Sequence, residues 1–207
     1  MFLQEINQDN NFLSLLELHK VLENSRKAIF CQLIPEEGEP TKAKVIDPSL
    51  GVPPEFKSVI PKAGSHVIMI NGSCWSITVA NPPPYLLVVG AGVDAQPVVA
   101  MAATLGWRVL VCDPRPANSR REFFPDAHSL LRCNPSELLE HQLADKIDAA
   151  VIMSHSISLD AEAMNCVSRM PLRYLGLLGP INRLEQVMKT AGLKRSDLPV
   201  NLSGPAG

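Results

Sequence analysis

A short glycine-containing segment of this sequence has the residue types needed to hold a phosphate. The segment Gly90-Ala91-Gly92-Val93-Asp94-Ala95 follows the apolar run Leu86–Val89. In such a G-x-G-x-x-A turn the first glycine permits a tight bend, the second lets a ligand approach the backbone, and the alanine allows close helix packing. Free N–H groups at the helix start favour a phosphate. We therefore take Gly90, Gly92 and Ala95 as candidate ligand-binding residues, with a plain structural turn as the alternative.

Charged side chains follow the next apolar run, Trp107–Cys112. Asp113 stands 21 positions beyond Gly92, where an acidic residue could bind ribose hydroxyls. Arg115, in a basic patch with two further arginines, could meet a phosphate, although a solvated loop is the alternative. Asp94 opposes pyrophosphate binding, because its carboxylate in the first helical turn would itself satisfy the positive helix end as a cap residue. The patch is completed by Arg120 and Arg121.

A hydroxyl, an imidazole and a carboxylate follow a later apolar run, at Ser154, His155 and Asp160. They do not predict a catalytic triad, because adjacent residues on a regular strand point to opposite faces and Ser154 cannot then bond His155. One of the two can still face a binding crevice, and His155 is the better candidate. Asp160 either contacts the ligand or supports the start of the following helix. Gly179, after another apolar run, completes the candidate residues.

Alternating strands and helices must position these residues. Short apolar strands separated by helices indicate a parallel sheet covered on both faces. We predict an α/β, Rossmann-like doubly wound, mostly parallel sheet, with the candidates in one crevice at the strand carboxyl ends. The predicted strands are Leu86–Val89, Trp107–Cys112, Ala127–Arg132, Ile147–Met153, Leu172–Leu178 and Leu198–Leu202, and the predicted helices are Ala95–Leu105, Ser136–Ala144, Asp160–Met170 and Asn182–Ala191. Residues 114–126 are predicted to form a loop in place of a crossover helix.

The sequence pattern of residues 1–84 predicts a small α+β domain. Asn71-Gly72 lies between two apolar runs and suits a type I′ hairpin turn. The proline-rich segment Glu36–Pro61 is predicted to be irregular. Pro82-Pro83-Pro84 forms a stiff extended boundary, so the predicted domains are residues 1–84 and 85–207. The other predicted elements are a helix capped by Asn11 and ending near Asn24, and strands at Ala28–Ile34, Ser65–Ile70 and Ser73–Ala80.

Composition excludes several classes of protein. The 207 residues include 19 Lys and Arg against 21 Asp and Glu, so the chain lacks the positive field that holds nucleic acid or an anionic membrane. Apolar runs fall short of the ~20 residues that span a bilayer. Because residues 1–11 lack the features of a secretory signal, we expect a cytoplasmic protein. Five widely spaced cysteines predict neither a disulfide framework nor a structural metal site.

The second part, residues 82–207, resembles the C-terminal Rossmann domain of the XdhC/CoxI family, the accessory factors of xanthine dehydrogenase and carbon monoxide dehydrogenase. The likeness rests on several motifs taken together. They are Leu87–Gly92 with Asp94–Pro97, Leu105–Trp107 with Asp113–Pro116, Ser154-His155 with Leu159-Asp160, Tyr174–Gly179, Phe124–Ala127 and Gly204–Gly207. Val93 and Pro180 depart from the family pattern, where histidine and serine are frequent. Residues 1–84 lack the family's Ser-x-Pro-Arg and Ser-Gly-Gly-Cys segments.

The resemblance implies a cytoplasmic, non-enzymatic chaperone that binds molybdenum cofactor (molybdopterin) and assists its insertion into a molybdenum hydroxylase such as xanthine dehydrogenase. It also implies a homodimer, with a cysteine desulfurase as a further partner. In that setting Asp113, Asp160 and His155 would hold the pterin ring, and Gly92 and Arg115 its phosphate. The glycine turn and Asp113 support an alternative, an NAD(P)-binding oxidoreductase. A third alternative is an interaction module without a ligand.

Overall fold

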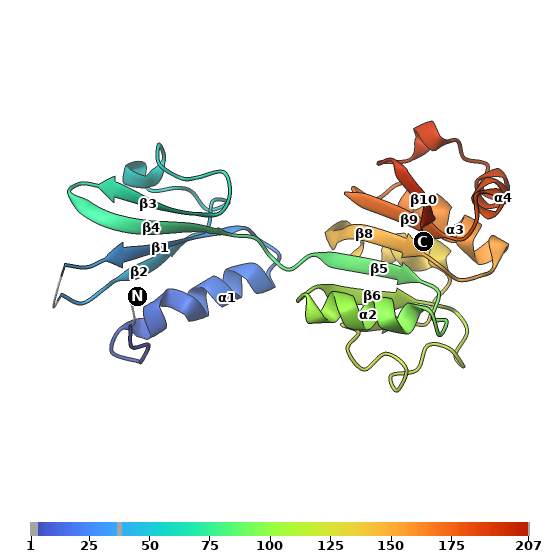
Figure 1. Ribbon diagram of the computed structural model, residues 1–207, viewed down its shortest axis with the longest axis horizontal. Coiled ribbons are helices and arrows are strands. Elements are labelled where there is room, and N and C mark those ends of the chain that lie inside the picture. The colour runs from blue at the N-terminus through green and yellow to red at the C-terminus, as the bar shows by residue number, and fades with distance from the viewer. Residues whose placement is uncertain (1–3, 37–38, 207) are drawn as a thin grey trace. The chain divides into compact units, whose positions relative to one another are not determined.

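The computed structural model describes residues 4–36 and 39–206, and the chain divides into two compact units, Met1–Pro83 and Pro84–Gly207. Among the described residues, the N-terminal unit contains an antiparallel four-stranded sheet in the order β2-β1-β4-β3 and the helix α1 (Figure 1). The strands are β1 (Ala28–Ile34), β2 (Ala43–Ile46), β3 (Ser65–Ile70) and β4 (Ser73–Ala80), and α1 is Leu15–Glu23. Asn71 and Gly72 both have positive φ, as the predicted hairpin turn requires.

Two N-terminal predictions were wrong. The helix begins at Leu15 and not beside Asn11, because residues 11–14 have positive φ and form a 3₁₀ turn without a side-chain cap bond. The segment predicted to be irregular contains β2, which pairs with β1 and places Ile46 in the core of this unit. A four-residue strand amid prolines has too short a pattern to be recognised before its partner strand is known.

The C-terminal unit has a six-stranded sheet in the order β10-β9-β8-β5-β6-β7, with every adjacent pair parallel. This confirms the predicted Rossmann-like α/β fold. The strand order reverses between β5 and β8, which is where such sheets bind ligands. The strands are β5 (Tyr85–Val89), β6 (Arg108–Cys112), β7 (Ser129–Leu131), β8 (Ile147–Ile152), β9 (Tyr174–Leu178) and β10 (Leu202–Ala206), and the helices are α2 (Ala95–Thr104), α3 (Ile157–Val167) and α4 (Ile181–Ala191).

Side chains alternate between the two faces of β5, and each face has its own core. Leu86 and Val88 pack with α2, whereas Leu87 and Val89 pack with α3 and α4. All five residues of β5 are buried, as expected for a central parallel strand. The helices on both faces hold the carboxyl end of β5 in a fixed position, and that end carries the glycine turn.

Some predicted elements of this unit differ from the structure. Residues predicted as the helix Ser136–Ala144 form two 3₁₀ turns, Pro135–Glu140 and Ala144–Lys146, because the backbone is extended at His141 between them. The last strand is Leu202–Ala206 and not Leu198–Leu202. The prediction for residues 114–126 was correct, since turns and no helix connect β6 to β7. In the part of the chain described here, no helix is long and apolar enough to cross a membrane.

Candidate functional site

The Gly90 turn packs directly against the chain that leaves β8. Gly90 has φ of +109°, and a Cβ atom there would lie 2.5 Å from Ser154 Cα. The amide of Gly90 donates to the Cys112 carbonyl at 2.8 Å, and that of Met153 donates to the Val89 carbonyl at 2.8 Å. Only glycine fits this position, and its absent side chain lets the carboxyl ends of β5, β6 and β8 come into backbone contact.

Asp113 and Arg115 form an ion pair beside this turn. The buried Asp113 carboxylate accepts bonds from Arg115 Nε at 2.8 Å, Arg115 Nη2 at 2.6 Å and the Ala91 amide at 2.8 Å. Burial acts to raise the pKa of Asp113, but the bonds from Arg115 and Ala91 outweigh it and hold that pKa below its usual value. The carboxylate in turn raises the pKa of Arg115. Asp113 is thus a charged anchor for Arg115.

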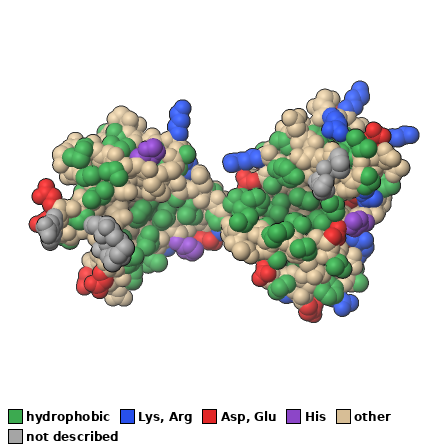
Figure 2. Space-filling view, viewed as in Figure 1, with side chains coloured by type: hydrophobic (Ala, Val, Ile, Leu, Met, Phe, Trp, Pro, Cys, Tyr) green, Lys and Arg blue, Asp and Glu red, His purple; other side chains and the backbone are tan. Residues whose placement is uncertain are grey.

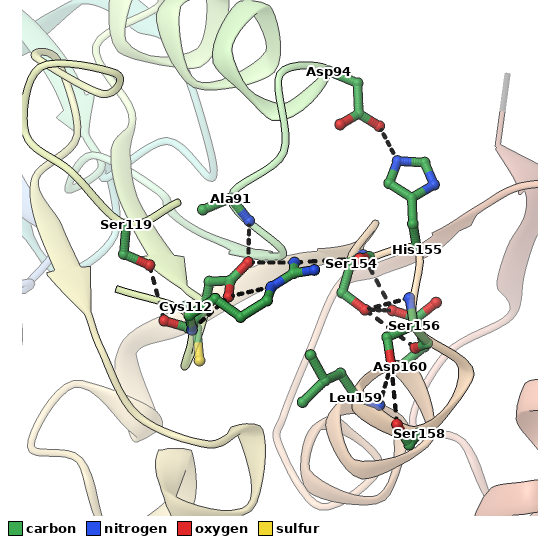
Figure 3. Close-up of polar contacts among 12 residues, drawn as sticks. Ala91, Asp94, Cys112, Ser119, Ser154, His155, Ser156, Ser158, Leu159 and Asp160 are labelled. Carbon is green, nitrogen blue, oxygen red and sulfur yellow. Dashed lines mark hydrogen bonds and ion pairs between the residues drawn. The ribbon is translucent and has the colours of Figure 1, made fainter. Parts of the chain in front are cut away.

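A second buried ion pair joins Asp160 to Arg183. The Asp160 carboxylate accepts bonds from the Ser154 amide at 3.1 Å, the Ser154 hydroxyl, and Arg183 Nη2 at 2.5 Å. Arg115 Nη2 also donates to the Ser154 carbonyl at 3.3 Å. Ser154 therefore connects the two pairs into one network across the ends of β6, β8 and α4. Figure 3 shows Ser154 and Asp160 turned toward one another.

Arg183 was not among the residues predicted from the sequence. It lies in the first turn of α4 and packs on Gly179, where a Cβ atom would lie 2.6 Å from Arg183 Cδ. Gly179 has φ of +123°, so this residue serves both the turn and the arginine. The sequence signal that could have revealed Arg183 is an arginine four residues after a glycine that ends a strand.

Asp94 and His155 form an exposed pair outside the buried network. Asp94 Oδ2 lies 2.6 Å from His155 Nε2, and the two side chains are 36% and 62% exposed. His155 has φ of +60°, a left-handed conformation that turns its imidazole toward Asp94, as Figure 3 shows. The cap role considered for Asp94 is not observed, because its side chain makes no cap bond to α2. Its Oδ1 atom instead lies 2.5 Å from where a Gly92 Cβ would be.

The structure thus brings nearly all the predicted residues to one edge of the sheet. Ala95 is fully buried and begins α2, so it packs and does not face the crevice. Ser154 and His155 lie beyond the end of β8, so the strand alternation invoked for them in the sequence does not apply. Ser154 bonds Asp160, and His155 pairs with Asp94. The basic patch does not form in the crevice. Arg121 donates to the Ala127 carbonyl at 2.5 Å and Arg120 lies over the Phe123 ring.

Metal-binding side chains do not gather in the described structure. Within residues 4–36 and 39–206, no group of three or more His, Cys, Asp or Glu side chains could hold a metal ion. The five cysteines are free thiols.

Comparisons with known proteins agree with these observations. A protein of Bacillus subtilis (strain 168), described as a probable xanthine dehydrogenase subunit, is 36% identical over 108 residues. The alignment covers 52% of this chain and 33% of that protein. A crystal structure of a xanthine dehydrogenase from Bacillus halodurans superposes with a TM-score of 0.74 at 22% identity, covering 96% of this chain and 60% of the other. That likeness shows the fold.

The chain spans about a third of the length of the Bacillus subtilis relative and 60% of the Bacillus halodurans structure. Residues 86–207 match the family described as the XdhC Rossmann domain. This match covers the glycine turn, both buried ion pairs and the Asp94–His155 pair, and it confirms the resemblance found in the sequence. The chain belongs to the XdhC family, which is related to xanthine dehydrogenase accessory proteins.

Proposed function

We propose that this protein binds molybdenum cofactor at the carboxyl edge of the parallel sheet and assists its insertion into a molybdenum hydroxylase. Membership of the XdhC family supports handling of this cofactor. The observation that carries the proposal is the network in which Ser154 links the Asp113–Arg115 and Asp160–Arg183 pairs beside the glycine turn. Such a network fixes two arginines at the ends of several strands, where a ligand of this fold binds.

The groups left accessible fit a phosphorylated pterin. Arg115 is 43% exposed, and its Nη1 atom has no hydrogen-bond partner among the described residues, so it can meet a phosphate. His155 Nδ1 is likewise without a partner in the described structure and can bond the polar edge of the ring. Gly92 offers backbone beside the imidazole, since a Cβ atom there would lie 3.9 Å from His155 Cδ2. The cofactor is cargo, and its molybdenum performs oxygen-transfer chemistry in the hydroxylase that receives it.

The two buried aspartates take a different part in this proposal from His155. Every oxygen of Asp113 and Asp160 already accepts a bond from an arginine, a serine or an amide of this chain. We therefore assign them as positioning residues that orient Arg115 and Arg183. Direct contact with the ring falls to His155 and, through its carboxylate, to Asp94. Gly90, Ala95, Ser154 and Gly179 then shape the turn and helix starts that surround the ligand.

The proposed recipient follows from the names of the relatives. Both the Bacillus subtilis relative and the solved structure are described as xanthine dehydrogenase proteins. We propose a xanthine dehydrogenase-type hydroxylase as the partner, and a cysteine desulfurase as the source of sulfur for the sulfurated cofactor.

Anaerobic titration calorimetry with molybdenum cofactor, and separately with NAD(H) and NADP(H), tests the proposal. The key variant is His155→Asn, because asparagine tolerates the left-handed backbone and keeps the fold. We expect it to weaken cofactor binding about tenfold, equivalent to ~1.4 kcal/mol. Arg120→Gln, which changes an exposed arginine outside the crevice, should bind as the unaltered protein does. Absence of cofactor binding, or equal binding by His155→Asn, would overturn the proposal.

Nicotinamide binding would instead favour the dehydrogenase alternative. One feature weighs against that outcome. Asp113, the residue placed to bind ribose hydroxyls, already accepts hydrogen bonds from Arg115. A shift in melting temperature that grows with NAD(P)H concentration and not with molybdenum cofactor would establish the alternative.

A further inference from the structure

Strand β3 forms an uncharged, exposed edge of the N-terminal sheet. In the described residues it pairs with β4 on one side and with no strand on the other (Figure 1). From residue 63 to residue 93 the sequence contains no Asp, Glu, Lys or Arg. The opposite edge strand, β2, is only four residues long. Lys42 directly precedes it and Lys44 lies within it. Short length and lysines protect an edge against pairing with another strand, and β3 has neither.

The register of the hairpin shows which backbone groups of β3 face outward. The Val79 amide donates to the Gly64 carbonyl at 2.9 Å, and the ladder continues from Ser65↔Thr78 to Ile70↔Ser73. In an antiparallel ladder both polar groups of a residue point to the same neighbour, and the next residue points away. The even-numbered residues therefore face β4. Ser65, Val67 and Met69 present their N–H and C=O groups to the open side.

The side chains along this edge are apolar and accessible. Val67 is 65% exposed and Met69 is 64% exposed. On the face drawn in Figure 2, hydrophobic side chains gather over the part of this unit where Figure 1 places β3 and β4. Apolar side chains beside a row of unpaired backbone groups are the features that strand addition uses.

We propose that β3 pairs with β3 of a second copy of this chain, in antiparallel orientation about a two-fold axis through Val67. This register pairs Val67 with Val67 of the other copy and Ser65 with its Met69, and it satisfies the outward groups of all three residues in each copy. Two identical strands that contain no Asp, Glu, Lys or Arg meet with no like charges of these residues opposed, and the register places His66 opposite Ile68 of the other copy and not opposite itself. The result is a continuous sheet shared by two copies with a self-complementary contact.

The oligomeric state of the full chain tests this proposal by sedimentation equilibrium over a range of concentrations. We expect a dimer that Val67→Lys converts to monomer, because the two-fold axis sets the new lysines against one another. The backbone groups of Val67 point away from β4, so the substitution leaves the β3–β4 ladder intact. At concentrations low enough for both proteins to be monomers, Val67→Lys should therefore melt at the same temperature as the unaltered protein. Val67→Thr, which retains strand propensity without charge, should remain a dimer.

The exposed apolar surface of α2 is another place where two copies could meet. Met101 is 62% exposed on α2, a helix without a charged residue. Met101→Lys should leave the dimer unchanged. If Met101→Lys dissociates the dimer and Val67→Lys does not, the interface lies on α2 and the proposal is wrong. A monomer at all concentrations overturns it as well.

Cross-linking tests the register itself, in a Cys74→Ser background that removes the partly exposed thiol of the hairpin. Paired Val67 Cα atoms would lie about 5.5 Å apart, so Val67→Cys should be joined by a bifunctional thiol reagent that spans about 5 Å. Ser65→Cys is the matched control, since four residues of offset would separate the two thiols by ~13 Å. Equal cross-linking of both variants, or of Ser65→Cys alone, would refute this register.

Discussion

Neutralising Asp160 should be among the most destabilising single changes in the C-terminal unit. Its carboxylate is fully buried and accepts bonds from Ser154 and Arg183, whose side chain is only 19% exposed. Asp160→Asn leaves the arginine without its counter-charge and puts an N–H₂ group where donors converge. Removing one partner of a buried pair costs ~3–5 kcal/mol, and because Arg183 keeps some access to water we expect about 3 kcal/mol. This corresponds to a fall in melting temperature of roughly 10 °C.

Differential scanning calorimetry of the full chain measures this effect. Glu162→Gln, an exposed change on the same helix, is the matched control and should shift the free energy of unfolding by less than about 0.5 kcal/mol. The double variant Asp160→Asn with Arg183→Met removes the stranded charge, so it should be more stable than Asp160→Asn alone. The reasoning is refuted if Asp160→Asn and Glu162→Gln have the same melting temperature. It is also refuted if the double variant is less stable than Asp160→Asn alone.

Three further predictions concern other parts of the molecule. Because the pKa of Asp113 is lowered by folding, its stabilisation is present at neutral pH and is lost as the pH falls below about 4; the stability gap between the unaltered protein and Asp113→Asn should therefore narrow in acid melting experiments. Gly106→Ala should lower the free energy of unfolding by the ~1–2 kcal/mol that a left-handed backbone costs, whereas Gly90→Ala should lower it by more because its Cβ also clashes with the backbone of Met153 and Ser154. Equal urea unfolding midpoints for the two variants would contradict this. Burial raises the pKa of Cys31 to about 11, so mass-spectrometric mapping at pH 8 should find Cys74 alkylated long before Cys31.

The parallel sheet could be predicted because its signal is local. Each buried strand is a short apolar run next to a helix or turn, and the all-buried residues of β5 are one example. The 3₁₀ turns at Pro135–Glu140 show where local reasoning fails. Asn134 and Glu137 form the capping box of a helix start, yet the backbone becomes extended at His141. A start signal does not determine how far a helix continues when tertiary packing ends it early.

The candidate site was predictable to the level of strand ends and no further. Glycines and polar residues directly after apolar runs identified Asp113, Ser154 and His155 from spacing alone. The partners of these residues depend on contacts between distant segments. Arg183 reaches Asp160 only because α3 and α4 pack side by side, and Asp94 reaches His155 only because the histidine backbone is left-handed. Neither fact leaves a pattern in the neighbouring residues.

The energies of the three acid–base pairs differ in a way that bears on ligand entry. The Asp160–Arg183 pair is the more deeply buried, so breaking it costs several kcal/mol. Asp113 is buried but the Arg115 side chain is 43% exposed, so solvent screening lowers the cost of breaking that pair, and its several hydrogen bonds still orient the arginine. The Asp94–His155 pair is exposed and worth at most about 1 kcal/mol. The left-handed backbone of His155 costs ~1–2 kcal/mol. A ligand that displaces this outer pair from Gly92 therefore loses little stabilisation and meets arginines that are already oriented.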